Sequence, residues 1–277
     1  GKAVNWSHSK TAFQLMKQTS RSLNHSVAKA FGLLDHFTVL QPSWGVRELA
    51  QHTGQNKSTI YRMLATLESL GVLRKDLETE RYELGLKLFE LGHRVQLQRA
   101  LVHQTHPALR EVADNIAETV HLGILRSERV FMIDKVESPK GLKLNSTIGA
   151  YSPVHCTSLG KVLLAYQRPE RQKQLLANID LEVYTPNTLS SKSDLQKHLK
   201  LVQQQAYALD REEFELGLIC LAVPVFNQQR ELVAALSAAG PANRFREQAL
   251  EDYLKILRQG AAAIRQRIGN FSLASIL

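Results

Sequence analysis

The stretch GQNKSTIYRMLATLESLGVL, residues 54–73, predicts a helix with two different faces. With about 100° of rotation per residue, its large apolar side chains gather within one arc: Ile60, Met63, Leu64, Leu67 and Leu70. The opposite arc and its edges carry small, hydroxylated or basic residues: Lys57, Ser58, Tyr61, Arg62, Ala65 and Ser69. Short side chains let a helix approach a groove closely, whereas a merely solvated face more often carries Glu, Lys and Gln. The helix alone is compatible with a face that binds in a groove and with a face that is merely solvated.

The flanking sequence favours the binding interpretation. Residues 26–37 place Val27, Phe31, Leu34 and Phe37 at helical intervals, with Ser26 as the expected N-cap. Residues 45–54 predict a short second helix that stops at a glycine. Two short β-like runs, 72–76 and 81–85, follow the third helix around a charged turn. Three helices followed by a hairpin is the order of a winged helix-turn-helix.

The residue types on this domain suit double-stranded DNA. Arg and Lys neutralise phosphates or bond guanine edges, hydroxyl groups bond phosphate oxygens, and the amides at a helix N-terminus attract anions. Arg62 is the best candidate for a guanine contact. The predicted DNA-binding residues are Lys57, Ser58, Thr59, Tyr61 and Arg62 on the helix and Arg74, Lys75 and Arg81 in the wing.

The charge supports a polyanionic partner. The chain has 277 residues, a net charge of +9 and a pI near 9.6, and residues 1–100 hold 14 Lys and Arg against 8 Asp and Glu. No apolar run approaches the roughly 20 residues that span a bilayer, and the first residues lack the apolar stretch of a signal peptide. We therefore expect a cytoplasmic protein without a membrane partner. Cys156 and Cys220 lie far apart in apolar surroundings and are expected to be free thiols.

The pattern along the chain predicts four segments. Residues 1–25 form a flexible basic arm, 26–85 the DNA-binding domain, 86–103 a linker helix, and 104–277 a second, larger domain. In the last segment, helical patterns at 106–118, 192–206 and 244–268 alternate with β-like runs at 119–136, 142–149, 218–227 and 231–240. We expect an α+β domain built around an antiparallel sheet.

Three segments resemble the IclR-type bacterial transcriptional regulators: NKSTIYRMLATLESLGVL (56–73), PVHCTSLGKVLLA (153–165), and DREEFELGLICLAVPVF (210–226) with ALSAAGPANRF (235–245). The resemblance covers residues 26–268, and RYELGLKLFELG (81–92) is similar to the subgroup that regulates sugar-acid catabolism. It implies a ligand-responsive repressor or activator of a catabolic operon that binds a palindromic operator. It also implies a homodimer, often paired into a tetramer, and a GAF-like C-terminal domain for a small organic acid: a sugar acid, a keto acid or an aromatic acid. No cofactor is implied.

The resemblance also indicates the effector pocket by motif position. The implied effector-binding residues are Ser146, Thr147, Thr157, Gly160, Asp210, Cys220 and Ser237. Two departures from the family pattern stand out. Ala239 replaces a second serine, which removes a hydroxyl donor for a carboxylate, and Gln55-Asn56 replaces Leu-Pro before the third helix. The residues themselves predict Thr157 or Ser158 as the cap of a helix whose free amides can receive an anion.

Other chemistries lack the spacing they need. Cys220 with His121 or His155 could form a nucleophilic pair, but Cys220 lies in an apolar run without a local base. His121, His155, Cys156 and Cys220 include zinc ligand types without a CxxC or HxxxH spacing, so metal binding stays open. Residues 210–213, DREE, favour a charged loop with Asp210 near a pocket, and TSLGK lacks the spacing of a phosphate-binding loop.

Two alternatives to a ligand-responsive regulator remain. One is an enzyme that acts on a small acid through the C-terminal domain, but no catalytic residue set is recognisable. The other is a general nucleic-acid-binding protein without a ligand. The second is disfavoured by a C-terminal region of about 170 residues whose charge is nearly balanced, with 21 Lys and Arg against 18 Asp and Glu over residues 101–277.

Overall fold

The computed structural model describes residues 24–95, 101–140 and 146–273. Its contacts divide the chain into two compact units, Gly1–Val95 and Gln96–Leu277. Of the basic arm expected over residues 1–25, all but Asn24 and His25 lies outside the described residues. No helix among the described residues is long and apolar enough to cross a membrane.

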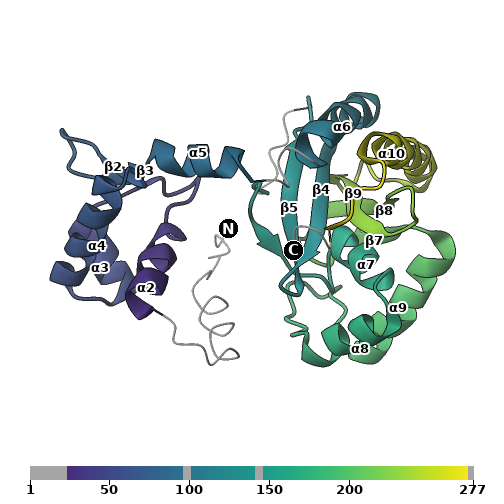
Figure 1. Cartoon of the computed structure of the whole chain (residues 1–277). Helices are drawn as coiled ribbons and strands as arrows, with labels where there is room; N and C mark the ends of the chain where they lie inside the picture. Colours follow the sequence, from purple (N-terminus) through teal and green to yellow (C-terminus); the bar gives the residue numbers. More distant parts are fainter. Residues whose placement is uncertain (1–23, 96–100, 141–145, 274–277) are drawn as a thin grey trace. The chain divides into compact units, whose positions relative to one another are not determined.

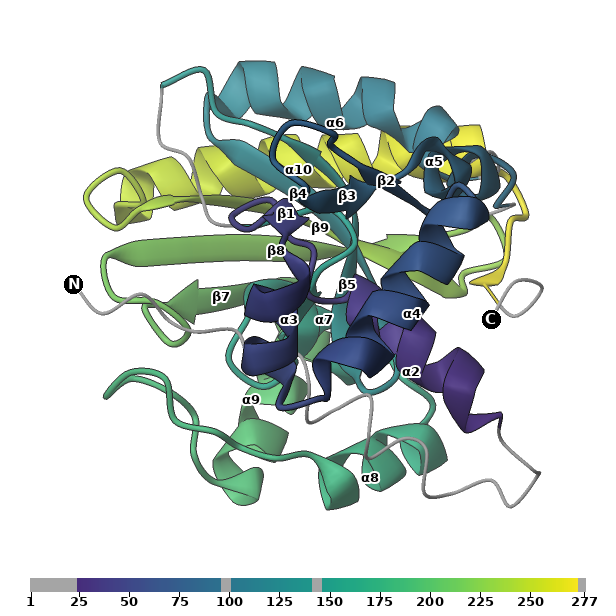
Figure 2. The same cartoon turned by 90° about the vertical axis from the view of Figure 1, so that its left-hand side faces the viewer.

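The first unit is a small helical domain with a three-stranded antiparallel sheet of order β1-β3-β2. Its elements, marked in Figures 1 and 2, are α2 (His25–Leu34), β1 (Ser43–Trp44), α3 (Val46–Thr53), α4 (Lys57–Ser69), β2 (Leu73–Lys75), β3 (Tyr82–Leu84) and α5 (Leu86–His93). The helix-turn-helix and wing order predicted from the sequence is therefore present. The extra strand β1 pairs with β3 through Ser43 and Trp44, and it was too short to show an alternating pattern.

The core of this unit corrects three details of the sequence prediction. Asn24, not Ser26, caps α2, because its side chain accepts from the Ser26 and Val27 amides. Phe31 is 64% exposed while Leu33 is buried, so α2 is turned from the expected orientation. On α4, Ile60, Leu64 and Leu67 are buried as expected, but Leu70 is 61% exposed, because it lies at the C-cap, past the last full turn.

The hairpin is joined tightly to the end of α4. The Gly85 amide donates to the Val72 carbonyl at 2.8 Å, and a Cβ atom on Gly85 would lie 2.2 Å from the Gly71 carbonyl oxygen. Only glycine permits this approach. Next, α5 begins at Leu86 and ends at His93 with Arg94 as its C-cap. The linker helix expected over 86–103 also includes residues 96–100, which lie outside the described residues.

The second unit is an α+β domain around a six-stranded antiparallel sheet of order β6-β5-β4-β9-β8-β7. Its helices are α6 (His103–Ile116), α7 (Ser158–Ala165), α8 (Pro169–Asn178), α9 (Lys192–Gln205) and α10 (Glu247–Ile268). Its strands are β4 (Thr119–Arg126), β5 (Arg129–Val136), β6 (Tyr151–Ser152), β7 (Ala208–Arg211), β8 (Leu218–Phe226) and β9 (Leu232–Pro241). Helix α8 was missed by sequence reasoning, because only Leu175 and Leu176 of its residues are buried.

Helices cover both faces of this sheet. Helices α6 and α10 lie on one face and α7 and α9 on the other, as Figures 1 and 2 show. Strand β8 alternates accordingly: Leu221 and Val223 join the core under α6 and α10, and Ala222 joins the core under α7. Three alanines, Ala208, Ala222 and Ala235, lie on the α7 face of the sheet. These small residues let α7 pack close to the strands.

The β run expected at 142–149 is only partly tested. Residues 141–145 lie outside the described residues. Residues 146–150 form a turn instead of a strand, with the Ala150 amide donating to the Thr147 carbonyl at 3.1 Å. The short strand β6 follows and pairs with β5.

Candidate functional site

The exposed face of α4 carries two basic side chains, Lys57 and Arg62. Lys57, Ser58, Tyr61 and Arg62 are exposed, and Thr59 is half-buried. Neither Lys57 nor Arg62 forms a salt bridge with any residue that the structure describes. The side chain of the N-cap, Asn56, makes no capping hydrogen bond. The first amides of α4 therefore lack the side-chain acceptor that usually satisfies them.

The cations of the wing, in contrast, are all paired within the domain. Arg74 forms a salt bridge with Glu83, and the Lys75 ammonium lies 3.2 Å from a Glu80 oxygen. Arg81 donates to the Ser43 carbonyl at 2.8 Å and to Glu48 at 2.7 Å. Arg81 thus ties β3 to β1 and to the first turn of α3, a role that the sequence did not reveal.

In the second unit, Thr157 and Gly160 shape the N-terminus of α7. The Thr157 hydroxyl accepts from the Gly160 amide at 3.2 Å and donates to the Pro153 carbonyl at 2.6 Å. The cap predicted at Thr157 is confirmed. A Cβ atom on Gly160 would lie 2.3 Å from the Val154 Cα atom, so the segment before α7 passes directly against this turn. The Thr157 hydroxyl is committed to the helix cap.

Asp210 and Cys220 lie opposite each other on β7 and β8. Asp210 is buried, and one of its oxygens accepts from the Glu213 and Phe214 amides at 2.8 and 3.4 Å. Burial raises the pKa of Asp210 to about 7, because a charged carboxylate loses solvation there. Asp210 therefore exists in both protonation states near neutral pH.

A buried ion pair beside Asp210 corrects the expected charged loop at residues 210–213. Lys161 of α7 is completely buried and forms a salt bridge with Glu213, which is 6% exposed. The second carboxylate oxygen of Glu213 is buried and has no hydrogen-bond partner among the described residues. Burial raises the pKa of Glu213, and the adjacent lysine opposes that effect. The signal in the sequence was a single lysine inside the otherwise apolar stretch SLGKVLLA.

The thiols of this region are not activated. Burial raises the pKa of both Cys156 and Cys220 above the usual value, which keeps them protonated and poorly nucleophilic. His155 is buried and its Nε2 atom lies 2.9 Å from the Glu182 carbonyl oxygen. Within the described ranges, no group of three or more His, Cys, Asp or Glu side chains is placed to hold a metal ion.

A third group lies on β9, β4 and β5. Ser237 and Lys135 are the register partners of His121 on its two sides. The His121 Nε2 atom lies 2.8 Å from the Ser146 hydroxyl, and the Lys135 ammonium donates to the Ser146 carbonyl at 2.9 Å. Burial, with the nearby charge of Lys135, lowers the pKa of His121 to about 3, so the imidazole is neutral at neutral pH. His121 and Lys135 were not among the predicted effector-binding residues.

The implied effector residues thus fall into distinct places. Asp210 and Cys220 form one pair, Ser146 and Ser237 both adjoin His121, and Thr157 with Gly160 forms the α7 cap. Thr147 is exposed in the turn after residue 145. Ala239, the departure noted above, lies opposite Cys220 in register and is buried.

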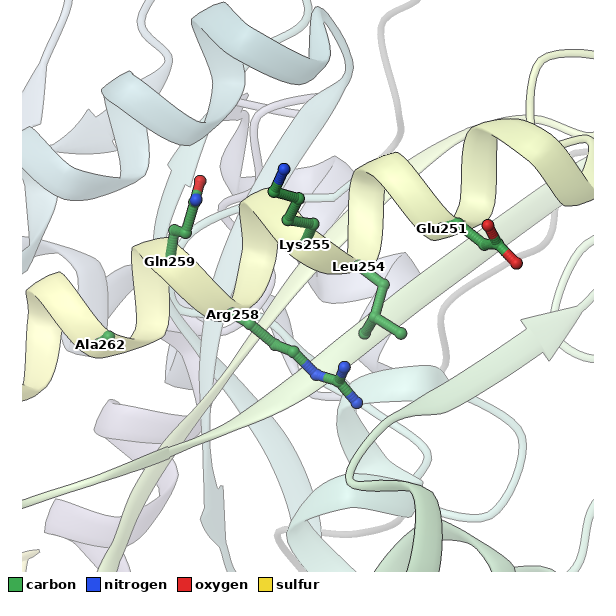
Figure 3. Close-up of a pocket in the computed structure, with 6 residues that line it drawn as sticks. All are labelled: Glu251, Leu254, Lys255, Arg258, Gln259 and Ala262. Atoms are coloured by element: carbon green, nitrogen blue, oxygen red, sulfur yellow. The ribbon is translucent and has the colours of Figure 1, made fainter.

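A separate open pocket of about 500 Å³ lies along α10. In Figure 3, Leu254 and Arg258 point to one side of the helix and Lys255 and Gln259 to the other. None of the residues predicted from the sequence lines it, and Arg258 already donates to the Gln205 carbonyl at 2.9 Å.

The geometry defines a helix-turn-helix DNA-binding protein with a separate α+β domain that contains buried polar groups. Comparison with known proteins identifies its family. The IclR helix-turn-helix domain model matches residues 26–77, and the model described as "Bacterial transcriptional regulator IclR C-terminal" matches residues 93–266. The chain belongs to the IclR family of bacterial transcriptional regulators.

Individual relatives are similar in sequence to this protein over most of its length. It is 38% identical to the transcriptional regulator KdgR of Dickeya chrysanthemi, over 88% of this chain and 80% of that protein. It is 37% identical to KdgR of Escherichia coli, over 88% of this chain and 92% of that protein. The crystal structure of Thermotoga maritima IclR matches with a TM-score of 0.72 and 30% identity, over 88% of this chain and 99% of that one.

Proposed function

We propose that this regulator binds its operator through α4. A small organic acid, bound in the second unit, controls the affinity for the operator. We assign DNA binding to residues 26–85, the connection to 86–103, and effector binding to 104–277. The observation that carries the DNA proposal is that Lys57 and Arg62, on the exposed face of α4, form no salt bridge within the described ranges of the chain. Unpaired cations can bind phosphate or guanine without first giving up an internal partner.

The roles within the DNA-binding domain follow from these contacts. Arg62, with Tyr61, reaches base edges, and Lys57, Ser58 and Thr59 contact phosphate beside the open amides of α4. Arg74 is exposed enough to exchange Glu83 for a phosphate. Lys75 can do the same with Glu80, whose side chain is 80% exposed. Arg81 is held by β1 and α3 and supports the wing from within.

An organic acid suits the second unit because its buried polar groups favour an anion. Asp210 is half protonated near pH 7, so below that pH it can donate a hydrogen bond to a ligand carboxylate. Above that pH its own charge repels the ligand. We place the effector site here, where Cys220 lies opposite Asp210 in register and α7 packs against β7 and β8.

The test is titration of the full-length protein with gluconate, pyruvate and benzoate, followed by operator titration at fixed salt. At least one acid is expected to raise the thermal midpoint, because a ligand of the native state stabilises it, and to change operator affinity at saturation. Its binding should weaken from pH 6 to pH 8 in the wild type and stay constant in Asp210→Asn. Acid binding without any change in operator affinity would contradict the proposed control.

We also propose that the protein acts as a dimer or tetramer held together mainly by α5. This helix buries none of its residues within its own unit and exposes Leu86, Phe89 and Leu91. Exposed apolar clusters of this kind mark association surfaces. A symmetric pair of reading helices would match a palindromic operator.

Substitution of both Leu86 and Phe89 by Glu is expected to reduce the sedimenting mass to that of one 31.1 kDa chain. Operator affinity should fall about a hundredfold or more, because the two half-sites are then bound separately. Val183→Glu, at an apolar residue of the second unit that is 61% exposed, is the matched control. An unchanged mass in the double variant would rule out α5 as the main association surface.

A further inference from the structure

We propose that Glu83 and Glu80 act as internal competitors of DNA phosphate. They hold the cations of the wing, residues 73–84, and thereby lower both the affinity for DNA and the dependence of that affinity on salt. The inference rests on the proposed binding of DNA by the first unit. It assigns a role in DNA binding to two carboxylates, a kind of group that the phosphate backbone repels.

The wing is an acidic segment of a basic domain. It is the hairpin of β2 and β3, marked in Figure 1. Residues 73–84 hold three Lys and Arg against four Asp and Glu, and the tip, residues 76–80, holds three of these carboxylates and no cation. A segment with net negative charge is repelled by DNA. The positive charge of the domain therefore does not come from its wing.

The register of the hairpin pairs Arg74 with Glu83. The two residues are directly opposed on β2 and β3, which places their side chains on the same face of the sheet, and they form a salt bridge. The Arg74 side chain is 65% exposed and that of Glu83 is 32% exposed. DNA can therefore reach this pair, but a phosphate that binds Arg74 has to replace a carboxylate that is already in place.

The second cation of the hairpin is held in the same way. The Lys75 ammonium lies 3.2 Å from a Glu80 oxygen and 6.0 Å from the centre of the Tyr82 ring. Its hydrogen bond to Glu80 raises the pKa of Lys75, so the ammonium stays charged at neutral pH. The Lys75 side chain is only 26% exposed. Arg74 is the more accessible cation, and we expect the larger effect from its partner, Glu83.

The exchange of a carboxylate for a phosphate has its own salt dependence. A cation that binds phosphate releases a counterion from the DNA, so each such contact makes the affinity depend more steeply on salt. When Arg74 leaves Glu83 for a phosphate, the vacated carboxylate attracts a cation from solution, and the net release of ions is close to zero. Lys57 and Arg62 of α4 form no salt bridge in the described part of the chain, so their phosphate or base contacts do not carry this cost.

The experiment titrates an operator duplex, selected from a random library by the wild type, and random DNA of equal length with the full-length protein at several salt concentrations. At low salt, Glu83→Gln is expected to bind both DNAs about two- to fivefold more tightly than the wild type, because Arg74 no longer has to leave a carboxylate. The slope of log affinity against log salt should steepen by about 0.9, the value for one added phosphate contact. Glu80→Gln should act in the same direction with a smaller effect.

The controls separate competition for Arg74 from general repulsion. Glu78→Gln removes the same charge from the same wing, but Glu78 forms no salt bridge with any residue that the structure describes, so its effect should be smaller than that of Glu83→Gln. Arg74→Met should reverse the gain in the Glu83→Gln background and change the affinity of the wild type less than about twofold. If Glu83→Gln does not fold by circular dichroism, Glu83→Thr, which suits a strand, replaces it.

Three results would overturn the inference. If a folded Glu83 variant binds DNA no more tightly than Glu78→Gln, Glu83 does not compete with phosphate. If the gain persists after Arg74→Met, the effect of Glu83 is general repulsion alone. In both cases the binding of DNA by the first unit stands. If the wild type selects no duplex from the library, the proposed DNA binding fails together with this inference.

Discussion

Arg62→Ala is expected to weaken operator binding by roughly 5- to 150-fold, which corresponds to about 1–3 kcal/mol for a side chain that bonds a base edge. Arg62 is exposed on α4, and no described carboxylate neutralises it. Random DNA of equal length should lose far less affinity, since a lost base contact affects only the specific complex. The measurement is a fluorescence-anisotropy titration at fixed salt, with an operator duplex selected from a random library by the wild type.

Two matched variants help to show whether Arg62 contacts a base or a phosphate. Arg171→Ala removes an exposed arginine from α8 in the second unit and should leave both affinities unchanged. Lys57→Ala is expected to weaken specific and random DNA alike, because phosphate contacts carry no sequence information. Equal losses on both DNAs for Arg62→Ala would make Arg62 a phosphate contact instead of a base contact.

The second large effect is expected in the core of the second unit. Lys161→Met should lower the free energy of unfolding by about 3–5 kcal/mol, because it leaves the buried Glu213 carboxylate without its partner. Urea unfolding followed with two probes can show which unit is destabilised. Far-UV circular dichroism follows both units, whereas fluorescence of Trp44 follows the first unit. Only the unfolding midpoint of the second unit should move to a lower urea concentration.

The paired variant tests the cause of that loss. Lys161→Met combined with Glu213→Leu removes both charges and should recover most of the stability, because apolar replacement of a buried pair is often neutral. Lys197→Met breaks an exposed salt bridge with Asp194, in which Lys197 is 75% exposed, and should cost less than about 1 kcal/mol. A double variant as unstable as Lys161→Met alone would show that side-chain shape, not charge, is the important factor.

Much of the DNA-binding domain could be predicted from the sequence because its signals are local. The apolar interval of Ile60, Leu64 and Leu67 determined the buried face of α4, and the glycine stop at Gly54 is present with a left-handed φ of 66°. The orientation of α2 was not predictable in the same way. Phe31 and Leu33 are both apolar, and only the packing of the tertiary structure decides which one is buried.

The pockets of the second unit depend on contacts that no local pattern contains. Lys161 and Glu213 are 52 positions apart, and His121 meets Ser146 through the pairing of β4 and β5 with the turn that follows. The pairing of Arg81 with Glu48 was hidden for the same reason, since the two residues are 33 positions apart. Asp210, the member of its acidic run that was placed near a pocket, lies opposite Cys220 in the sheet, and its place in an effector pocket stays a prediction.

The alanines beneath α7 have a consequence for how relatives of this protein could diverge. Ala208, Ala222 and Ala235 are almost completely buried and contribute one methyl group each to the layer between sheet and helix. A substitution there alters interior volume, while the residues of α4 keep their identity. With the effector beside Asp210 and Cys220 and the operator on α4, as proposed above, duplicated genes would acquire new chemical inputs through changes of one or two methyl groups, and each copy would still recognise the promoters of its ancestor.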